Sequence, residues 1–189
     1  MSLPNDPLPW PVLATQIAFH NRWIKVVLDE VQLPNGQQHE YTRLEGPAVG
    51  VAVIGFNNAG EVLLEREYRH GVGQVIWQLP GGLAHGDEDL QQAGLRELAE
   101  ETGYAPRQVT AESVRYLGMI WHVPVYGPLI SHIYAAWGLQ PTGIIQRDST
   151  EFVTLHWVSL AWLKDAVRDG TIKDPTVIAA FAHLLLIVL

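Results

Sequence analysis

Three carboxylates lie close together in the segment from Arg96 to Gly103, at positions that a helix would bring onto one face. Glu97, Glu100 and Glu101 are spaced i, i+3 and i+4, and residues at those spacings are neighbours on a helix surface. Like charges at that spacing repel, so helix stability does not account for them. A hard divalent cation such as Mg²⁺ or Mn²⁺ would turn the repulsion into coordination, because these ions prefer carboxylate oxygens. The alternative is a solvated acidic face.

The local sequence predicts the helix that would carry these carboxylates. We expect it to run from about Glu88 to Thr102, with Asp87 as its N-cap and with Glu88 and Asp89 in its first turn. Gly103 would supply the C-terminal stop. The helix also has apolar positions that can anchor it to a core: Leu90, Leu95, Leu98 and Ala99.

A glycine-containing turn precedes the helix. The run WQLPGG from Trp77 to Gly82 predicts a tight turn whose glycines let the backbone approach a ligand or metal closely. Turn and helix together resemble the box of the Nudix hydrolases at every specified position. The matching positions are Gly82, Glu88 after five residues, and then, after seven more, the run Arg96, Glu97, Leu98, Ala99, Glu100, Glu101, Thr102, Gly103 and Tyr104.

The resemblance implies a set of metal ligands. Nudix enzymes hydrolyse a nucleoside diphosphate linked to another moiety, by attack of water on phosphorus, and metal ions at a carboxylate cluster assist them. By resemblance, Glu97 and Glu101 are the leading metal ligands and Glu100 is the next. The backbone carbonyl of Gly81 would complete the shell, and Gly82 would lie against the substrate. An exposed helix residue is the alternative for Glu100.

Two arginines are candidates for supporting roles. Arg96 directly precedes Glu97 and points about 100° away from it on a helix, so we expect it to orient carboxylates, paired with one such as Glu88. Glu88 could contact metal or substrate, or serve only as a partner of the helix dipole. Arg69 ends a predicted strand before the turn, and its guanidinium suits a phosphate contact. An exposed arginine at a strand end is the alternative.

The general base and the base-stacking residue are less well specified. ADP-ribose pyrophosphatases commonly carry a glutamate in the loop that corresponds to residues 122–130, and this loop contains no carboxylate. Glu151 is the first candidate for the base; Asp148, His122 or a metal-bound hydroxide are alternatives. Gln78 replaces a glutamate often found in the turn, and Gly94 stands where alanine is usual. The candidate stacking platforms, each of which could equally be a packing residue, are Trp23, Tyr68, Trp77, Trp121 and Tyr126.

Outside the box, the chain is similar to the ADP-ribose pyrophosphatase branch from about Trp23 onward. The similarity includes Glu67-Tyr68-Arg69 before the turn and an N-terminal hairpin, which in those enzymes helps to build a homodimer. The resemblance therefore implies metal-dependent hydrolysis of ADP-ribose or a related nucleoside diphosphate sugar into two monophosphates. GDP-mannose, a CDP-alcohol or a dinucleotide are alternative substrates. A non-catalytic nucleotide-sugar sensor is an alternative of a different class.

Composition restricts the partners. The formal net charge of −8 argues against general nucleic-acid binding, which requires clustered Lys and Arg. The chain has no cysteine, so it has no disulfide and no thiolate metal site, which is compatible with a cytoplasmic protein. No signal peptide is evident. The apolar tail from Val177 to Leu189 is too short to span a bilayer, and we expect a core or interface helix there and no membrane partner.

The remaining elements predict an α/β fold. We expect a Nudix-type α/β/α sandwich with a mixed sheet in residues 46–189, preceded by an extension and an antiparallel β-hairpin in residues 1–45. The hairpin strands would be Ile17–Val31 and Gln37–Leu44, after an irregular segment in residues 1–15. A lone hairpin is marginally stable, so this one should pack on the main domain or support a homodimer. The expected elements of the main domain, apart from the box helix, are strands at 48–56, 61–69, 114–121, 131–139 and 152–158 and helices at 159–169 and from 175.

Overall fold

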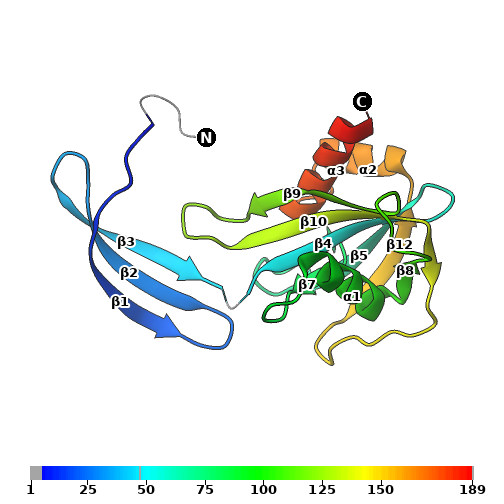
Figure 1. Cartoon of the computed structure of the whole chain (residues 1–189), viewed down its shortest axis with the longest axis horizontal. Coiled ribbons are helices and arrows are strands. Elements are labelled where there is room, and N and C mark those ends of the chain that lie inside the picture. The colour runs from blue at the N-terminus through cyan, green and yellow to red at the C-terminus, as the bar shows by residue number, and fades with distance from the viewer. Residues whose placement is uncertain (1–5, 47, 189) are drawn as a thin grey trace. The chain divides into compact units, whose positions relative to one another are not determined.

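The computed structural model describes residues 6–46 and 48–188, in two compact units (Figure 1). One unit comprises Met1–Pro47 with Val123–Leu129, and the other comprises Ala48–His122 with Ile130–Leu189. The first unit thus also contains a loop from the second half of the chain. Leu44 N–H donates to the carbonyl of Tyr126 at 2.6 Å, which ties that loop to the N-terminal sheet.

The N-terminal unit is a three-stranded antiparallel sheet in the order β1-β2-β3. Its strands are β1 (Val12–His20), β2 (Lys25–Gln32) and β3 (Gln38–Glu45). The predicted turn between β2 and β3 is confirmed: Leu33 N–H donates to Gln37 at 2.8 Å, and Gly36 has a φ of 83°. The sheet therefore contains the predicted hairpin and one strand more.

The extra strand corrects the predictions for the N-terminal segment. The described part of residues 1–15 is not irregular throughout, because β1 begins at Val12, whereas residues 1–5 lie outside the described residues. The single strand expected over Ile17–Val31 is also wrong. The chain reverses where the Asn21 side chain accepts hydrogen bonds from the N–H groups of Trp23 and Ile24, at 2.8 and 2.9 Å.

The second unit is built on a seven-stranded mixed sheet with the order β12-β5-β4-β10-β9, to which β6 is added beside β5 and β7 beside β4. Strands β4 and β10 run parallel, and the other pairs are antiparallel. The strands of this sheet are β4 (Gly50–Phe56), β5 (Val62–Arg69), β6 (Gln74–Gln78), β7 (Gly81–Leu83), β9 (Val114–Trp121), β10 (Ile130–Trp137) and β12 (Val153–Val158). A short separate pair consists of β8 (Tyr104–Pro106) and β11 (Leu139–Pro141).

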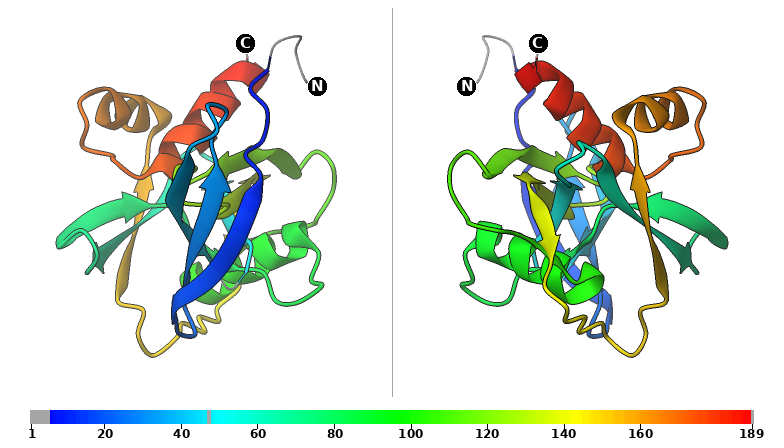
Figure 2. Two further views of the ribbon diagram at one scale, coloured as in Figure 1. Left: turned by 90° about the vertical axis from the view of Figure 1, so that its left-hand side faces the viewer. Right: turned by 90° about the vertical axis from the view of Figure 1, so that its right-hand side faces the viewer.

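Helices cover both faces of this sheet (Figures 1 and 2). Alternate residues of β4 point to opposite faces, as strand geometry requires: Val53 packs in the cluster with α1 (Leu90–Thr102), and Ile54 packs in the cluster of the other face. That second cluster includes side chains of α2 (Leu160–Arg168) and α3 (Pro175–Val188). The predicted α/β/α sandwich with a mixed sheet is confirmed.

The apolar C-terminal tail forms a helix that packs on the sheet. In α3, Val177, Ala180, Phe181 and Leu184 are buried in the core cluster opposite α1. This agrees with the expected core helix. In the part of the chain that the structure describes, no helix combines the length and the apolar character needed to cross a membrane.

Candidate active site

Helix α1 begins two residues later than the sequence predicts. Its N-cap is Asp89, whose side chain accepts a hydrogen bond from Gln92 N–H at 3.0 Å; the predicted cap, Asp87, does not have this role. Glu88 therefore lies before the helix rather than in its first turn. Gly103 ends the helix as predicted, in the left-handed conformation with a φ of 71°.

The helix lies close against the central sheet. Leu95 and Leu98 are buried on the sheet side. Gly94 is also buried, and a Cβ at this position would lie 3.2 Å from Cγ2 of Val53 on β4. Glycine, where the family usually has alanine, thus allows the closest approach of helix and sheet.

The glycine turn brings backbone atoms against the carboxylates of α1. A Cβ on Gly82 would lie 2.6 Å from the carboxyl carbon of Glu97, and a Cβ on Gly81 would lie 2.2 Å from the backbone oxygen of Val51. Both positions therefore require glycine. The predicted close approach is real, but the groups approached are the neighbouring strand and the Glu97 carboxylate.

Two of the three carboxylates on the predicted face are substantially buried. Oε2 of Glu101 accepts a hydrogen bond from Gly81 N–H at 2.7 Å, and the residue is 8% exposed. Burial, followed by the charge of Glu65, raises the pKa of Glu101. Burial also raises the pKa of Glu97, against the opposing effect of Arg96. Negative charge in this region is thus poorly compensated.

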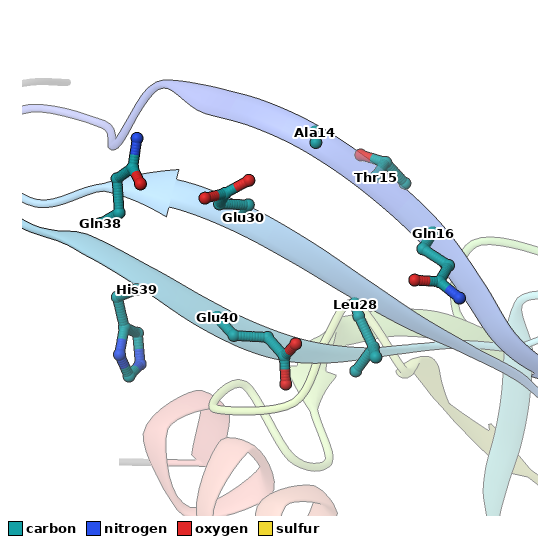
Figure 3. Close-up of a pocket in the computed structure, with 8 residues that line it drawn as sticks. All are labelled: Ala14, Thr15, Gln16, Leu28, Glu30, Gln38, His39 and Glu40. Carbon is teal, nitrogen blue, oxygen red and sulfur yellow. The ribbon is translucent and has the colours of Figure 1, made fainter.

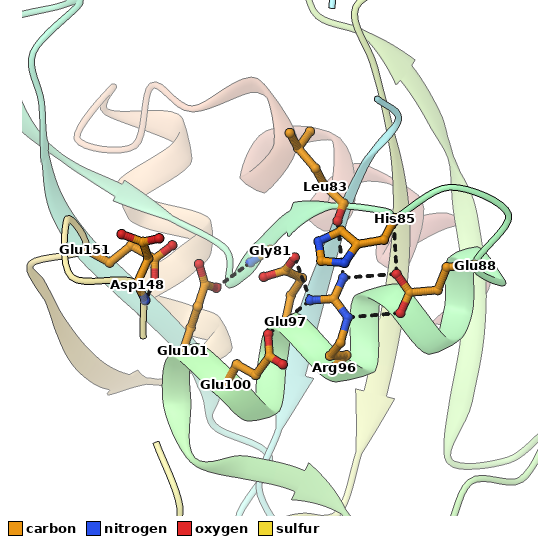
Figure 4. Close-up of polar contacts among 10 residues, drawn as sticks. All are labelled: Gly81, Leu83, His85, Glu88, Arg96, Glu97, Glu100, Glu101, Asp148 and Glu151. Carbon is orange, nitrogen blue, oxygen red and sulfur yellow. Dashed lines mark hydrogen bonds and ion pairs between the residues drawn. The ribbon is translucent and has the colours of Figure 1, made fainter. Parts of the chain in front are cut away.

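Arg96 is the centre of the polar contacts at the site (Figure 4). Its Nε and Nη2 donate to the two oxygens of Glu88 at 2.9 and 3.0 Å, which is the pairing expected from the sequence. Its Nη1 donates to Glu97 and to Glu100, both at 3.0 Å. Arg96 thus neutralises part of the repulsion on this face, in addition to the orienting role expected of it.

Glu88 is fixed by two kinds of donor. Besides the paired contacts with Arg96, it accepts a hydrogen bond from the backbone N–H of His85 at 3.0 Å. The Arg96 contacts, followed by the His85 N–H, lower the pKa of Glu88 to about 2. In this structure Glu88 holds Arg96 in place.

The comparisons with known proteins agree with this architecture. The model of the NUDIX domain family matches residues 46–181. The chain belongs to the Nudix hydrolase family. A second model, the nucleoside diphosphate sugar hydrolase N-terminal domain, matches residues 10–44.

Individual relatives cover nearly the whole chain. A methanol dehydrogenase activator of Bacillus methanolicus is 30% identical over 91% of this chain and 90% of its own. An ADP-ribose pyrophosphatase of Bacillus subtilis is 25% identical over the same shares. The solved structure of an ADP compounds hydrolase superposes with a TM-score of 0.83 at 20% identity, covering 97% of this chain and 96% of that chain. That last similarity establishes the fold alone.

Nudix hydrolases typically depend on a divalent metal, and the donor chemistry of this site fits one. The groups around the glycine turn are oxygen donors, and burial has raised the pKa of Glu97 and Glu101; both features suit a hard cation. Within residues 6–46 and 48–188, no three carboxylates or imidazoles converge as a ready set of metal ligands. In this conformation Arg96 and Gly81 N–H instead bind oxygens of the α1 carboxylates.

The candidate general bases are located on two loops. Glu151 accepts a hydrogen bond from Asp148 N–H at 2.9 Å (Figure 4), and its charge contributes to the raised pKa of both Glu97 and Glu101. The side chain of His122 instead pairs with Ser131, at 2.8 Å between Nε2 and Oγ. Glu151 is therefore electrostatically part of the carboxylate site.

Arg69 is held by two side chains at the end of β5. Its Nε donates to Gln78 at 2.5 Å, and its Nη2 pairs with Glu67 at 3.0 Å. Gln78 also donates to the same Glu67 oxygen, at 3.0 Å. The Arg69 side chain remains 53% exposed, so a positioned guanidinium is still accessible to an anion.

The predicted stacking candidates differ in accessibility. Trp77 packs edge-on against Trp162 and His156 and belongs to the core side of the sheet, so packing accounts for it. The other candidates are exposed, and two of them lie in the N-terminal unit. Those exposed candidates are Tyr68 and Trp121 in the second unit, and Trp23 and Tyr126 in the first.

Sequence reasoning assigned no role at the site to three charged residues, Glu65, Glu67 and Arg147. Glu65 and Glu67 lie on β5, and Arg147 donates from Nε to the backbone oxygen of Glu101 at 2.6 Å. Glu65 carried a signal in the sequence, because it follows the apolar run Val62–Leu64 inside a strand that the fold buries. A charged residue in such a position is rarely there for stability alone.

The N-terminal sheet has a hollow of its own, of about 430 Å³ (Figure 3). Eight residues of β1, β2 and β3 line it, and polar side chains predominate. The lining residues are Ala14, Thr15, Gln16, Leu28, Glu30, Gln38, His39 and Glu40. None of them belongs to the Nudix box.

Proposed function

We propose that this Nudix hydrolase is a metal-dependent diphosphatase that cleaves the diphosphate linkage of ADP-ribose or a related nucleoside diphosphate sugar into two monophosphates. The observation that carries the proposal is the pair of poorly compensated carboxylates, Glu97 and Glu101, against the Gly81–Gly82 turn. The match of residues 10–44 to the N-terminal domain of nucleoside diphosphate sugar hydrolases supports the substrate class. The similarity to the ADP-ribose pyrophosphatase of Bacillus subtilis supports ADP-ribose as the substrate.

The residues of the site would share the work as follows. Glu97, Glu101, Glu100 and the Gly81 carbonyl would hold Mg²⁺ or Mn²⁺. When bound, such an ion would neutralise the diphosphate and assist the activation of water. Arg96 keeps Glu97 and Glu100 oriented from the side of Glu88.

Two further residues would act on the substrate and on the attacking water. The accessible guanidinium of Arg69 would bind a phosphate oxygen of the substrate. Glu151 would accept the proton from the attacking water. Gly82 would lie against the substrate with its backbone, and the absence of a side chain there makes room for the Glu97 carboxylate.

The test is turnover of the full-length protein with Mg²⁺ and with Mn²⁺ on ADP-ribose, GDP-mannose, ADP-glucose, NADH and dNTPs. The expected result is release of two monophosphates, fastest with ADP-ribose or another sugar nucleotide, and loss of activity on addition of a chelator. A faster rate with NADH or dNTPs would show that the substrate belongs to a different class from the nucleoside diphosphate sugars. Hydrolysis that continues in the presence of a chelator would refute the metal dependence.

A second candidate function has support from one relative. The Bacillus methanolicus relative is called an activator of another enzyme, which suits a protein that binds a nucleotide and regulates a partner. The same assay distinguishes the two readings. Tight binding of ADP-ribose without hydrolysis would favour the regulator, whereas turnover at enzymatic rates would favour the hydrolase.

We also propose that residues 1–45 serve homodimerisation and that residues 46–189 form the hydrolase domain. Every residue of β1 is exposed, and the apolar side chains of Ile17 and Phe19 are 58% and 52% exposed. An exposed apolar edge strand is a surface that a second copy can cover. Sedimentation at micromolar concentration should show a dimer, and Ile17→Lys should shift it toward monomer. The control is Val109→Lys, at an exposed apolar residue of the other unit; a monomeric wild-type protein would refute the proposal.

A further inference from the structure

One buried carboxylate of the central sheet has no structural explanation. Glu65 on β5 is 2% exposed. Within the described part of the chain, its Oε1 is a buried side-chain oxygen without a hydrogen-bond partner. Burying an unpaired carboxylate oxygen costs free energy, so the fold alone gives no reason for a glutamate here.

The strand pattern directs this side chain toward the layer of α1. Leu63 packs in the cluster that contains the buried leucines of α1, whereas Leu64 packs in the cluster of the opposite face. Glu65 therefore shares the face of Leu63. Its partner in β12 is Leu155, which packs against the same α1 cluster. The Glu65 carboxylate thus points into the layer that also contains the Glu101 carboxylate.

Glu65 and Glu101 affect one another electrostatically. Burial raises the pKa of each, and the negative charge of Glu65 raises that of Glu101 further. Glu151 acts on both in the same direction. Negative charges on β5, on α1 and at Glu151 therefore act on one another.

The positive groups that face Glu65 do not satisfy it. Arg147 and Arg69 both lower the pKa of Glu65, but their effect does not outweigh burial. Arg69 is already paired with Glu67 and Gln78, and Nε of Arg147 is bound to the backbone oxygen of Glu101. One buried oxygen of Glu65 therefore still lacks a hydrogen-bond donor among the described residues.

We propose that Glu65 is an additional cation-binding residue, which binds a divalent ion together with Glu101. This inference rests on the proposed metal-dependent function and adds to it a ligand from β5, outside the box. A divalent cation would give Oε1 its missing partner and would relieve the repulsion between the two carboxylates. Without a cation, the same glutamate is a source of instability.

The test is calorimetric titration of Mn²⁺ into the full-length protein and into Glu65→Gln. Glutamine keeps the shape of the side chain and removes its charge. We expect Glu65→Gln to weaken Mn²⁺ binding by roughly tenfold or more, the scale on which residues supporting a metal site act. The matched control is Glu112→Gln, which removes an exposed carboxylate in the same unit and should leave the affinity unchanged.

Thermal unfolding provides a second readout that does not depend on activity. Without metal, Glu65→Gln should unfold at the same temperature as the wild type or higher, because an unpaired buried charge is removed. With Mn²⁺, its gain in melting temperature should be smaller than that of the wild type. Glu65→Asp, which keeps the charge but withdraws the carboxylate by one methylene, should also weaken Mn²⁺ binding, and it remains informative if the glutamine variant does not fold.

The outcomes separate this inference from the proposed function. If Glu101→Gln abolishes Mn²⁺ binding while Glu65→Gln binds as tightly as the wild type, the inference is refuted and the proposed function stands. If the wild-type protein neither binds Mn²⁺ nor hydrolyses a nucleotide, the proposed function fails, and the role of Glu65 fails with it.

Discussion

Two buried carboxylates, one in each unit of the molecule, have opposite surroundings. Asp29 on β2 is 5% exposed and accepts hydrogen bonds from Arg43 Nε and Thr15 Oγ1, both at 2.8 Å. Glu65 on β5 is buried to a similar degree but has an oxygen without a partner. The Arg43 and Thr15 contacts lower the pKa of Asp29, whereas burial raises the pKa of Glu65.

The difference separates a carboxylate that supports the fold from one that the fold tolerates. Buried polar groups in proteins are nearly always hydrogen-bonded, so an exception requires a reason. In the N-terminal sheet that requirement is met by neighbouring strands. In the hydrolase domain, the residues around Glu65, Glu97 and Glu101 leave negative charge in excess, as a cation site requires.

The largest predicted effect is on catalysis, and it tests whether the excess negative charge of the hydrolase domain serves a cation site. Glu101→Gln should reduce turnover by roughly three orders of magnitude, because a leading metal ligand loses its charge. The fold should persist, since the amide can still accept the hydrogen bond from Gly81 N–H. Steady-state kinetics and circular dichroism test both parts, with Glu112→Gln as the control. Near-normal turnover in a folded variant would overturn the metal assignment.

The next largest predicted effect concerns Asp29, the buried carboxylate whose oxygens are hydrogen-bonded. Arg43→Ala should lower the free energy of unfolding by about 2 kcal/mol, because it leaves Asp29 buried without its main partner. The loss is smaller than for a fully buried ion pair because solvent reaches the partly exposed Arg43. Urea denaturation measures the change. The control is Arg168→Ala, which breaks an exposed ion pair with Asp165 and should have little effect. Equal losses in the two variants would show that the Asp29 contacts stabilise the protein no more than an exposed ion pair does.

The pH dependence of stability should follow from the same contacts. The pKa of Asp29 is lower in the folded protein than in an unfolded chain, so its stabilising contribution is fully present above about pH 4. The contribution is lost as the pH falls through the folded-state pKa. Urea midpoints of the wild type and of Asp29→Asn should therefore converge on acidification. A constant difference down to strongly acidic pH would contradict this assignment.

The smallest predicted effect is an increase in the free energy of unfolding rather than a loss. Glu65→Leu should raise the free energy of unfolding of the metal-free protein by about 1 kcal/mol, because an unpaired buried charge is replaced by an apolar side chain. Urea denaturation in the presence of a chelator measures this, with Glu112→Leu as the control for a leucine at an exposed site. A clear loss of stability would show that Glu65, like Asp29, supports the fold.

Local sequence signals predicted much of the fold where one element depends only on its own residues. Ser159, where the predicted helix 159–169 begins, caps α2 by accepting a hydrogen bond from Trp162 N–H at 3.1 Å, and Gly103 ends α1 as predicted. The N-terminal strands were harder to predict, because the apolar density around Trp23 does not reveal that the Asn21 side chain reverses the chain. The cap of α1 was ambiguous because Asp87 and Asp89 are both suitable residue types.

The sequence by itself determined the shared face of Glu97, Glu100 and Glu101, since helical periodicity follows from spacing alone. Only the tertiary structure decided which groups from distant segments act on that charge. Arg147 donates to the backbone oxygen of Glu101 from the segment before β12, and the register of β5 adds Glu65 from a strand far away in the sequence. Contacts of this kind depend on how strands pair and helices pack, and no local pattern encodes them.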